Sequence, residues 1–119
     1  MSNINDSLDA LLAVGGAKAV ALVDSSTGMV LGEAGSGIDL EVAAAGNTEV
    51  VRAKLRTVKS LGLDEEIEDM LITLSSQFHI IRPLSSNPEV FIYLVLERDK
   101  ANLALARIKV KEVDAQLAL

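Results

Sequence analysis

The chain has no cysteine and no tryptophan, and only 3% of its 119 residues are aromatic. Without cysteine there can be no disulfide, no zinc–thiolate site and no thiol nucleophile. So few aromatic rings argue against a surface that stacks nucleic-acid bases, and they predict an aliphatic core. Basic residues are also scarce, because 11 Lys and Arg stand against 17 Asp and Glu. The resulting formal net charge of −6 disfavours nucleic acid as a partner.

Long apolar runs and targeting signals are lacking as well. The longest apolar runs, such as residues 90–96, are far shorter than the ~20 residues needed to cross a bilayer. The N-terminus is polar and acidic, unlike the basic start of a secretory signal. We therefore expect a single domain over residues 1–119 that acts in the cytoplasm and does not insert into membranes.

Three helices are expected from the spacing of apolar residues, over residues 2–14, 40–61 and 100–117. Asp39 and Asp99 are the expected N-caps of the second and third helices, since a carboxylate can accept from the free N–H groups of a first turn. Gly62 is expected to end the middle helix in a Schellman motif, in which Leu63 contacts Val58.

Five strands are expected over residues 19–23, 29–31, 70–75, 78–84 and 90–96. Short turns join them within each group, so the sheet should be mainly antiparallel. Residues 90–96 are apolar at every position, which indicates a central strand covered on both faces. Pro83 suggests a strand end or an edge. The order αββαβββα predicts an α/β fold in which helices pack on the faces of one sheet.

The middle helix carries more apolar surface than a sheet-covering helix needs. Its polar stripe consists of Glu41, Thr48, Arg52, Arg56 and Lys59. Two apolar stripes remain, about 100° apart: Leu40, Ala44, Asn47, Val51, Leu55 and Val58 form one, and Ala43, Gly46, Val50, Ala53, Thr57 and Leu61 form the other. The second stripe could be covered by the first or last helix of the same chain, or by a second copy. We favour the second copy, because two-fold dimers are the commonest assembly.

Sites for chemistry are not evident. Gly15-Gly16 lacks the Gly-Lys-Ser/Thr of a phosphate loop, and residues 35–40 lack the third glycine of a dinucleotide site. The single histidine, His79, is expected to be a hydrogen-bonded or half-exposed strand residue rather than a catalyst. No group of residues has metal-ligand spacing. We expect no catalytic residue, cofactor or metal. The acidic run 64–69 is either a solvated loop or a surface that steers a basic partner.

Several segments, taken in order, resemble the roadblock/LC7 family, and the resemblance covers nearly the whole chain. They are the opening helix with Gly15-Gly16, residues 21–24 and 27–31, the long middle helix, residues 91–96, Asp99, and the ANLALAR segment at 101–107, which is similar to the bacterial branch. The resemblance implies a profilin-like, five-stranded antiparallel sheet with helices on both faces. It also implies a homodimer formed by the middle helix and the strand after it. The residues at that interface would be Ala43, Ala44, Asn47, Val50, Val51, Lys54, Met70, Ile72 and Leu74.

The function implied by this resemblance is non-catalytic regulation of a Ras-like small GTPase, by activation of its hydrolysis or by scaffolding. Partner-facing residues would then be Glu41, Thr48, Arg52 and Arg56. One alternative is a scaffold of the dynein-light-chain or signalling-complex kind, without GTPase activation. A weaker alternative is a small-ligand sensor, which the lack of aromatic residues disfavours. A hydrolase resting on His79 and nearby serines is the weakest alternative.

Overall fold

A computed structural model of the chain describes residues 3–117. Within them, three helices and five strands follow in the order α1 (Ile4–Leu12), β1 (Ala17–Asp24), β2 (Met29–Gly35), α2 (Leu40–Ser60), β3 (Met70–Thr73), β4 (Gln77–Pro83), β5 (Val90–Glu97) and α3 (Leu103–Gln116). This order confirms the predicted α/β arrangement αββαβββα. The expected start of the first helix at Ser2 lies outside the described residues.

All five strands form one antiparallel sheet in the order β2-β1-β5-β4-β3. The central position of β5 matches its composition, because the strand is buried from Val90 to Leu96. Such a continuous apolar run suits a strand that is covered on both faces. The outer strands are β2 and β3, and each has a neighbour on one side only among the described residues.

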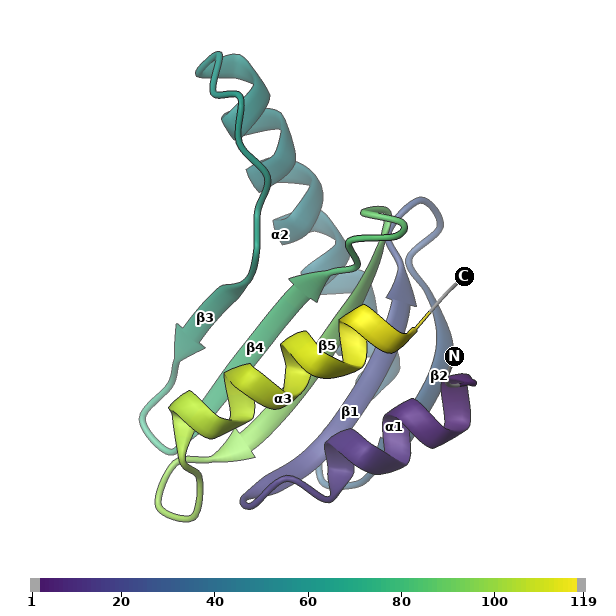
Figure 1. Cartoon of the computed structure of the whole chain (residues 1–119), viewed down its shortest axis with the longest axis vertical. Coiled ribbons are helices and arrows are strands. Elements are labelled where there is room, and N and C mark those ends of the chain that lie inside the picture. Colours follow the sequence, from purple (N-terminus) through teal and green to yellow (C-terminus); the bar gives the residue numbers. More distant parts are fainter. Residues whose placement is uncertain (1–2, 118–119) are drawn as a thin grey trace.

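Helices cover the two faces of the sheet unequally (Figure 1). The helices α1 and α3 lie side by side on one face, whereas α2 lies alone behind the other and contacts mainly β1 and β2. Two separate clusters of buried residues correspond to these faces. Leu11 and Val110 belong to the α1–α3 side, and Val51 and Tyr93 belong to the α2 side. The first and last helices are therefore too far from α2 to cover its second apolar stripe.

Local polar contacts set the ends of α2. The Asp39 side chain accepts from the backbone N–H of Val42, as predicted. At the other end, Gly62 adopts φ +70°, a left-handed conformation that suits glycine. Its N–H donates to the carbonyl of Lys59, and the N–H of Leu63 donates to that of Val58. Both hydrogen bonds of a Schellman motif are thus present, and the predicted helix end is confirmed.

The cap predicted for the last helix is wrong by three residues. Asn102, not Asp99, caps α3, and its side chain accepts from the N–H of Leu105. The reason is a close approach between two loops. Gly16 lies so near Ala101 that a Cβ on it would be 2.9 Å from Ala101. The chain around Ala101 is held against this glycine loop, and the helix begins only after it.

A proline separates the connector between α2 and β3 from the sheet. The ladder between β3 and β4 begins with Met70 opposite Ile81. The N–H of Leu84 donates toward β5, to Val90. Since backbone groups alternate along a strand, position 83 faces β3, where Pro83 has no N–H to donate. Residues 64–69 therefore leave the sheet and carry no regular structure.

A buried carboxylate that the sequence did not single out joins α3 to β4. Asp114 Oδ2 lies 2.8 Å from Arg82 Nε, and the two side chains are only 1% and 12% exposed. The same carboxylate accepts from the backbone N–H of Ser85 at 2.9 Å and from its hydroxyl at 3.0 Å. These contacts fix the start of the β4–β5 loop against the end of α3.

Replacing Asp114→Ala should lower the free energy of unfolding by about 3 kcal/mol, because Arg82 would be left buried without its counter-charge. Urea denaturation monitored by circular dichroism measures this. Glu112→Ala on the same helix is the control, since Glu112 is exposed and such changes stay within about 0.5 kcal/mol. Equal midpoints for the two variants would contradict the role given to Asp114.

Thr48, expected on the exposed polar stripe and facing a partner, is instead buried and only 5% exposed. Its Oγ1 lies beside Gly28 in the β1–β2 turn and has no hydrogen-bond partner within residues 3–117. The expectation was wrong because Thr48 lies one helical turn from both Ala44 and Val51, at the margin of the stripe that contacts the sheet.

The change Thr48→Val should raise the free energy of unfolding by about 1 kcal/mol, because it removes an unpaired buried hydroxyl while keeping the shape of the side chain. Chemical denaturation of the two proteins measures the difference. Thr57→Val is a matched control on the same helix, since the Thr57 hydroxyl is exposed and donates to the carbonyl of Ala53. A loss of stability in Thr48→Val would contradict the prediction.

Candidate functional site

The side of α2 that contacts the sheet is packed in the core of the chain itself. Leu40, Ala44 and Val51 are buried together with Phe91 and Tyr93. Ala44 and Val51 were expected at a dimer interface, and for these two residues the expectation needs correction. At 1% and 0% exposure they have no surface left for a second copy. They lie on the stripe that covers the sheet, about 100° from the outer stripe.

The outer flank of α2 is mostly exposed in the protomer, and only Ala43 at its inner margin packs partly against the core. We define this flank by its residues Val42, Ala43, Gly46, Val50, Ala53, Thr57 and Leu61. Three of its large apolar side chains are well exposed, at 68% for Val42, 43% for Val50 and 66% for Leu61. An apolar strip of this length on a helix marks a surface for another molecule, because its exposure to water is unfavourable.

Strand β3 supplies the second part of the predicted interface, on the same face of the sheet. Met70 and Ile72 are half-buried against the α2-side cluster, and Leu74 is exposed just beyond the strand. No strand in the described part of the chain pairs with the outer edge of β3. Free backbone groups along such an edge can pair with another strand. The flank of α2 and the edge of β3 thus provide two open surfaces on one side of the protein.

The polar residues expected near this surface fall into two groups. Glu41, Arg52, Lys54 and Arg56 are all exposed, and the two arginines lie one turn apart on α2. Asn47, in contrast, is half-buried and interacts with the hydroxyl of Tyr93 on β5, so its side chain faces the sheet. Asn47 is therefore shared between the core and the predicted interface.

The only histidine is part of a polar chain beneath α2. His79 Nδ1 lies 3.0 Å from the hydroxyl of Tyr93, and Nε2 lies 2.8 Å from Oε1 of Gln77. A neutral imidazole with its proton on Nε2 satisfies both contacts. Partial burial lowers the pKa of His79, which favours this neutral form. Burial also raises the pKa of Tyr93, and the hydrogen bond from Asn47 opposes that rise. The predicted hydrogen-bonded strand histidine is confirmed.

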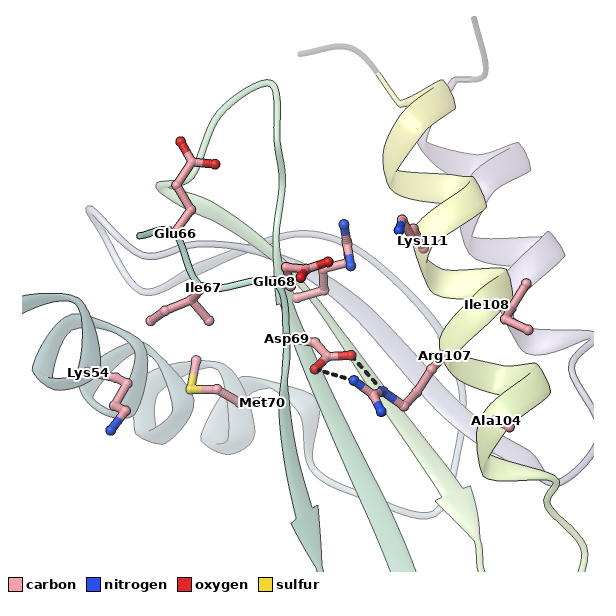
Figure 2. Close-up of a pocket in the computed structure, with 11 residues that line it drawn as sticks. Lys54, Glu66, Ile67, Glu68, Asp69, Met70, Ala104, Arg107, Ile108 and Lys111 are labelled. Atoms are coloured by element: carbon pink, nitrogen blue, oxygen red, sulfur yellow. Dashed lines mark hydrogen bonds and ion pairs between the residues drawn. The ribbon is translucent and has the colours of Figure 1, made fainter. Parts of the chain in front are cut away.

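A hollow of about 630 Å³ lies between the connector 64–69 and α3 (Figure 2). An ion pair bridges it, with Arg107 Nε 2.8 Å from Asp69 Oδ2 and its terminal nitrogen 2.9 Å from Oδ1. This bidentate contact raises the pKa of Arg107 and ties the connector to the last helix. Both partners are in segments that the sequence analysis noted, but not as a pair.

The two glycine segments that were considered as phosphate loops have structural roles. Gly16 packs on Ala101, and a Cβ on Gly35 would collide with the backbone of Lys18 and Ala19. Both glycines are needed for close packing within the chain. Within residues 3–117, no group of three or more Asp, Glu or His residues could hold a metal ion. No helix in that range has the length and apolarity to cross a membrane.

Comparison with known proteins finds similarity in structure only. No protein-family model and no curated protein matches the chain. Among solved structures, MglB of Myxococcus xanthus has a TM-score of 0.83 at 22% identity, covering 98% of this chain and 89% of that one. A roadblock/LC7 domain from Streptomyces avermitilis has a TM-score of 0.81 at 13% identity, covering 97% and 94%.

A third solved structure, an MglB in a tetrameric arrangement, has a TM-score of 0.81 at 18% identity and covers 99% of this chain and 90% of that one. Each of these similarities extends over almost the full length of both chains. The five-stranded antiparallel sheet and the helices on both of its faces agree with the predicted architecture. The chain therefore has the roadblock/LC7 fold, in the form found in bacterial MglB proteins.

Proposed function

We propose that this protein is a non-catalytic homodimer that binds a Ras-like small GTPase and modulates its nucleotide cycle. The observation that carries the proposal is the bare apolar flank of α2, on a fold shared with MglB and other roadblock/LC7 domains. The resemblance noted in the sequence implies regulation of small GTPases in the cytoplasm. The resemblance also implies that the GTPase itself contributes the catalytic groups.

The dimer forms when two copies bring their α2 flanks and β3 edges together. Ala43 and Val50 would then lie at the helix contact, with Asn47 and Lys54 at its margins. The small side chains of Ala43, Gly46 and Ala53 allow two helices to approach closely. Met70, Ile72 and Leu74 would be covered in the same step. Burial of this apolar surface provides the driving force.

The GTPase binds to the polar face of the paired helices. Glu41, Arg52 and Arg56 are exposed there and can pair with charges on its surface. Regulation then follows if the dimer binds one conformation of the GTPase switch loops more tightly than the other. Such binding shifts the population of the switch loops toward that conformation. A scaffold that binds both nucleotide states equally is the alternative.

The change Val50→Asp should convert the dimer to monomers, because it would place an unpaired charge within the helix contact. Light scattering on a size-exclusion column measures the mass at about 10 µM protein. Leu105→Asp is the control, since Leu105 is another exposed apolar residue, 62% exposed against 43% for Val50, and lies on α3, across the sheet from α2. A monomeric parent protein, or a Val50→Asp variant that stays dimeric, would show that the interface lies elsewhere.

The parent protein should bind one nucleotide state of its GTPase at least tenfold more tightly, a difference of about 1.4 kcal/mol. Calorimetric titration with a Ras-like GTPase encoded beside this chain, loaded with GDP or with a non-hydrolysable GTP analogue, measures both affinities. Arg52→Glu with Arg56→Glu should weaken binding, whereas Lys109→Glu on α3 should not. Equal affinities in the two states would exclude regulation and leave the scaffold role.

A further inference from the structure

A second hollow, of about 280 Å³, adjoins the first and shares Glu66, Ile67, Glu68 and Arg82 with it. It opens between the last turns of α2, residues 65–68 of the connector and the end of β4 with its following loop. Its apolar lining consists of Leu55, Val58, Leu63, Ile67, Pro83, Leu84 and Pro88. At this volume the hollow is smaller than most small-molecule sites and suits one or two side chains of another protein.

Two features of the chain keep this hollow open. The second half of α2 extends beyond the sheet, so no strand lies beneath it (Figure 1). Pro83 cannot pair with the connector, which therefore diverges from β4. The Schellman turn directs Leu63 back toward Val58, and Leu63 remains 46% exposed. Apolar side chains from three segments thus line a hollow that the chain itself does not fill.

The charges around the hollow are unbalanced. Its basic residues are Lys59 and Arg82, and its acidic residues are Glu65, Glu66 and Glu68. Arg82 is neutralised by its buried contact with Asp114, which leaves three carboxylates against one lysine. Within residues 3–117, none of the three carboxylates lies within 4.0 Å of a cationic group.

The larger hollow has no such excess. Once Arg107 is paired with Asp69, and Arg82 with Asp114, Lys54 and Lys111 remain against Glu66 and Glu68. Charge at that site therefore selects neither a basic nor an acidic partner. Glu66 and Glu68 line both hollows, and the smaller one is more acidic because it has Glu65 in addition and one unpaired lysine instead of two.

We propose that the smaller hollow docks a basic amphipathic segment of a partner protein. One or two apolar side chains of the segment enter between Val58, Leu63 and Pro88, and its lysines or arginines face Glu65 and Glu66. Apolar contact supplies affinity, and the acidic rim selects the sign of the partner and speeds its approach. This surface is separate from the outer flank of α2, and the proposal does not depend on the GTPase.

The test uses the full-length protein and a fluorescent twelve-residue peptide of lysine and leucine at helical spacing. Fluorescence anisotropy should show binding that weakens several-fold between 50 and 300 mM salt. A lysine–serine peptide and a glutamate–leucine peptide should both bind at least tenfold more weakly. These comparisons separate the apolar requirement from the charge requirement.

Variants then locate the binding. Glu65→Gln with Glu66→Gln should weaken binding of the lysine–leucine peptide about fivefold, as expected when two exposed ion pairs are lost. Asp9→Asn with Glu33→Gln removes the same charge from exposed positions on α1 and β2 and should leave the affinity unchanged. This control is needed because any protein with a net charge of −6 attracts a basic peptide. Leu63→Ser should reduce affinity at high salt as well as at low salt.

Two outcomes would overturn the proposal. Equal weakening by the two charge pairs would show that the peptide responds only to the net charge of the protein. Conversion of a dimer to monomers by the peptide, or by Leu63→Ser, would show that a second copy of this chain occupies the hollow. Thermal unfolding of each variant establishes that it is folded. Since no GTPase is present, failure here leaves the GTPase proposal standing, and the reverse also holds.

Discussion

A single helix has to cover one entire face of a five-stranded sheet, and the other features of the molecule follow from this constraint. On the opposite face two helices share the task, and their sheet-facing apolar side chains, such as Leu11 and Val110, are buried. On its own face α2 covers β1 and β2 closely. The far strand β3 is left with half-buried apolar residues and a free edge. The under-covered face is therefore the one on which further association is favourable.

Polar contacts within the protomer stiffen this open face. Gln77, His79 and Tyr93 form a chain of hydrogen bonds from β4 to β5, and Asn47 of α2 interacts with the Tyr93 hydroxyl. Burial lowers the pKa of His79, which favours a neutral imidazole beneath α2. A rigid surface loses little conformational entropy when a partner binds.

Local signals in the sequence were sufficient for most of the fold. The Asp39 cap, the Gly62 turn and the buried run in β5 each depend on residues a few positions apart, and all were predicted. The interface residues on α2 were implied by the family resemblance, and they spanned both apolar stripes of the helix. Ala44 and Val51 belong to the stripe that covers the sheet, and Thr48 was placed on the polar stripe, but all three are buried.

Contacts between distant segments could not be predicted from local signals in the sequence. Arg82 and Asp114 are 32 residues apart, and Asp69 and Arg107 are 38 apart. Their pairing depends on strand register and on where α3 crosses the sheet. A lone arginine on a strand and a lone aspartate on a helix give no local sign of a buried ion pair. An alignment of related sequences could have revealed such pairs as correlated changes.

The length of α2 connects the two surfaces proposed for binding. Its 21 residues span about 32 Å, and it contacts mainly β1 and β2. The second half of the helix extends beyond the sheet (Figure 1). A short helical segment in water is only marginally stable, and here the protomer supports it with its C-terminal cap and the contacts of residues 55–63. A partner on the flank of α2 would stabilise the projecting turns from one side, and one in the smaller hollow would do so from the other. The projecting half of α2 is thus the element whose stability depends most on binding.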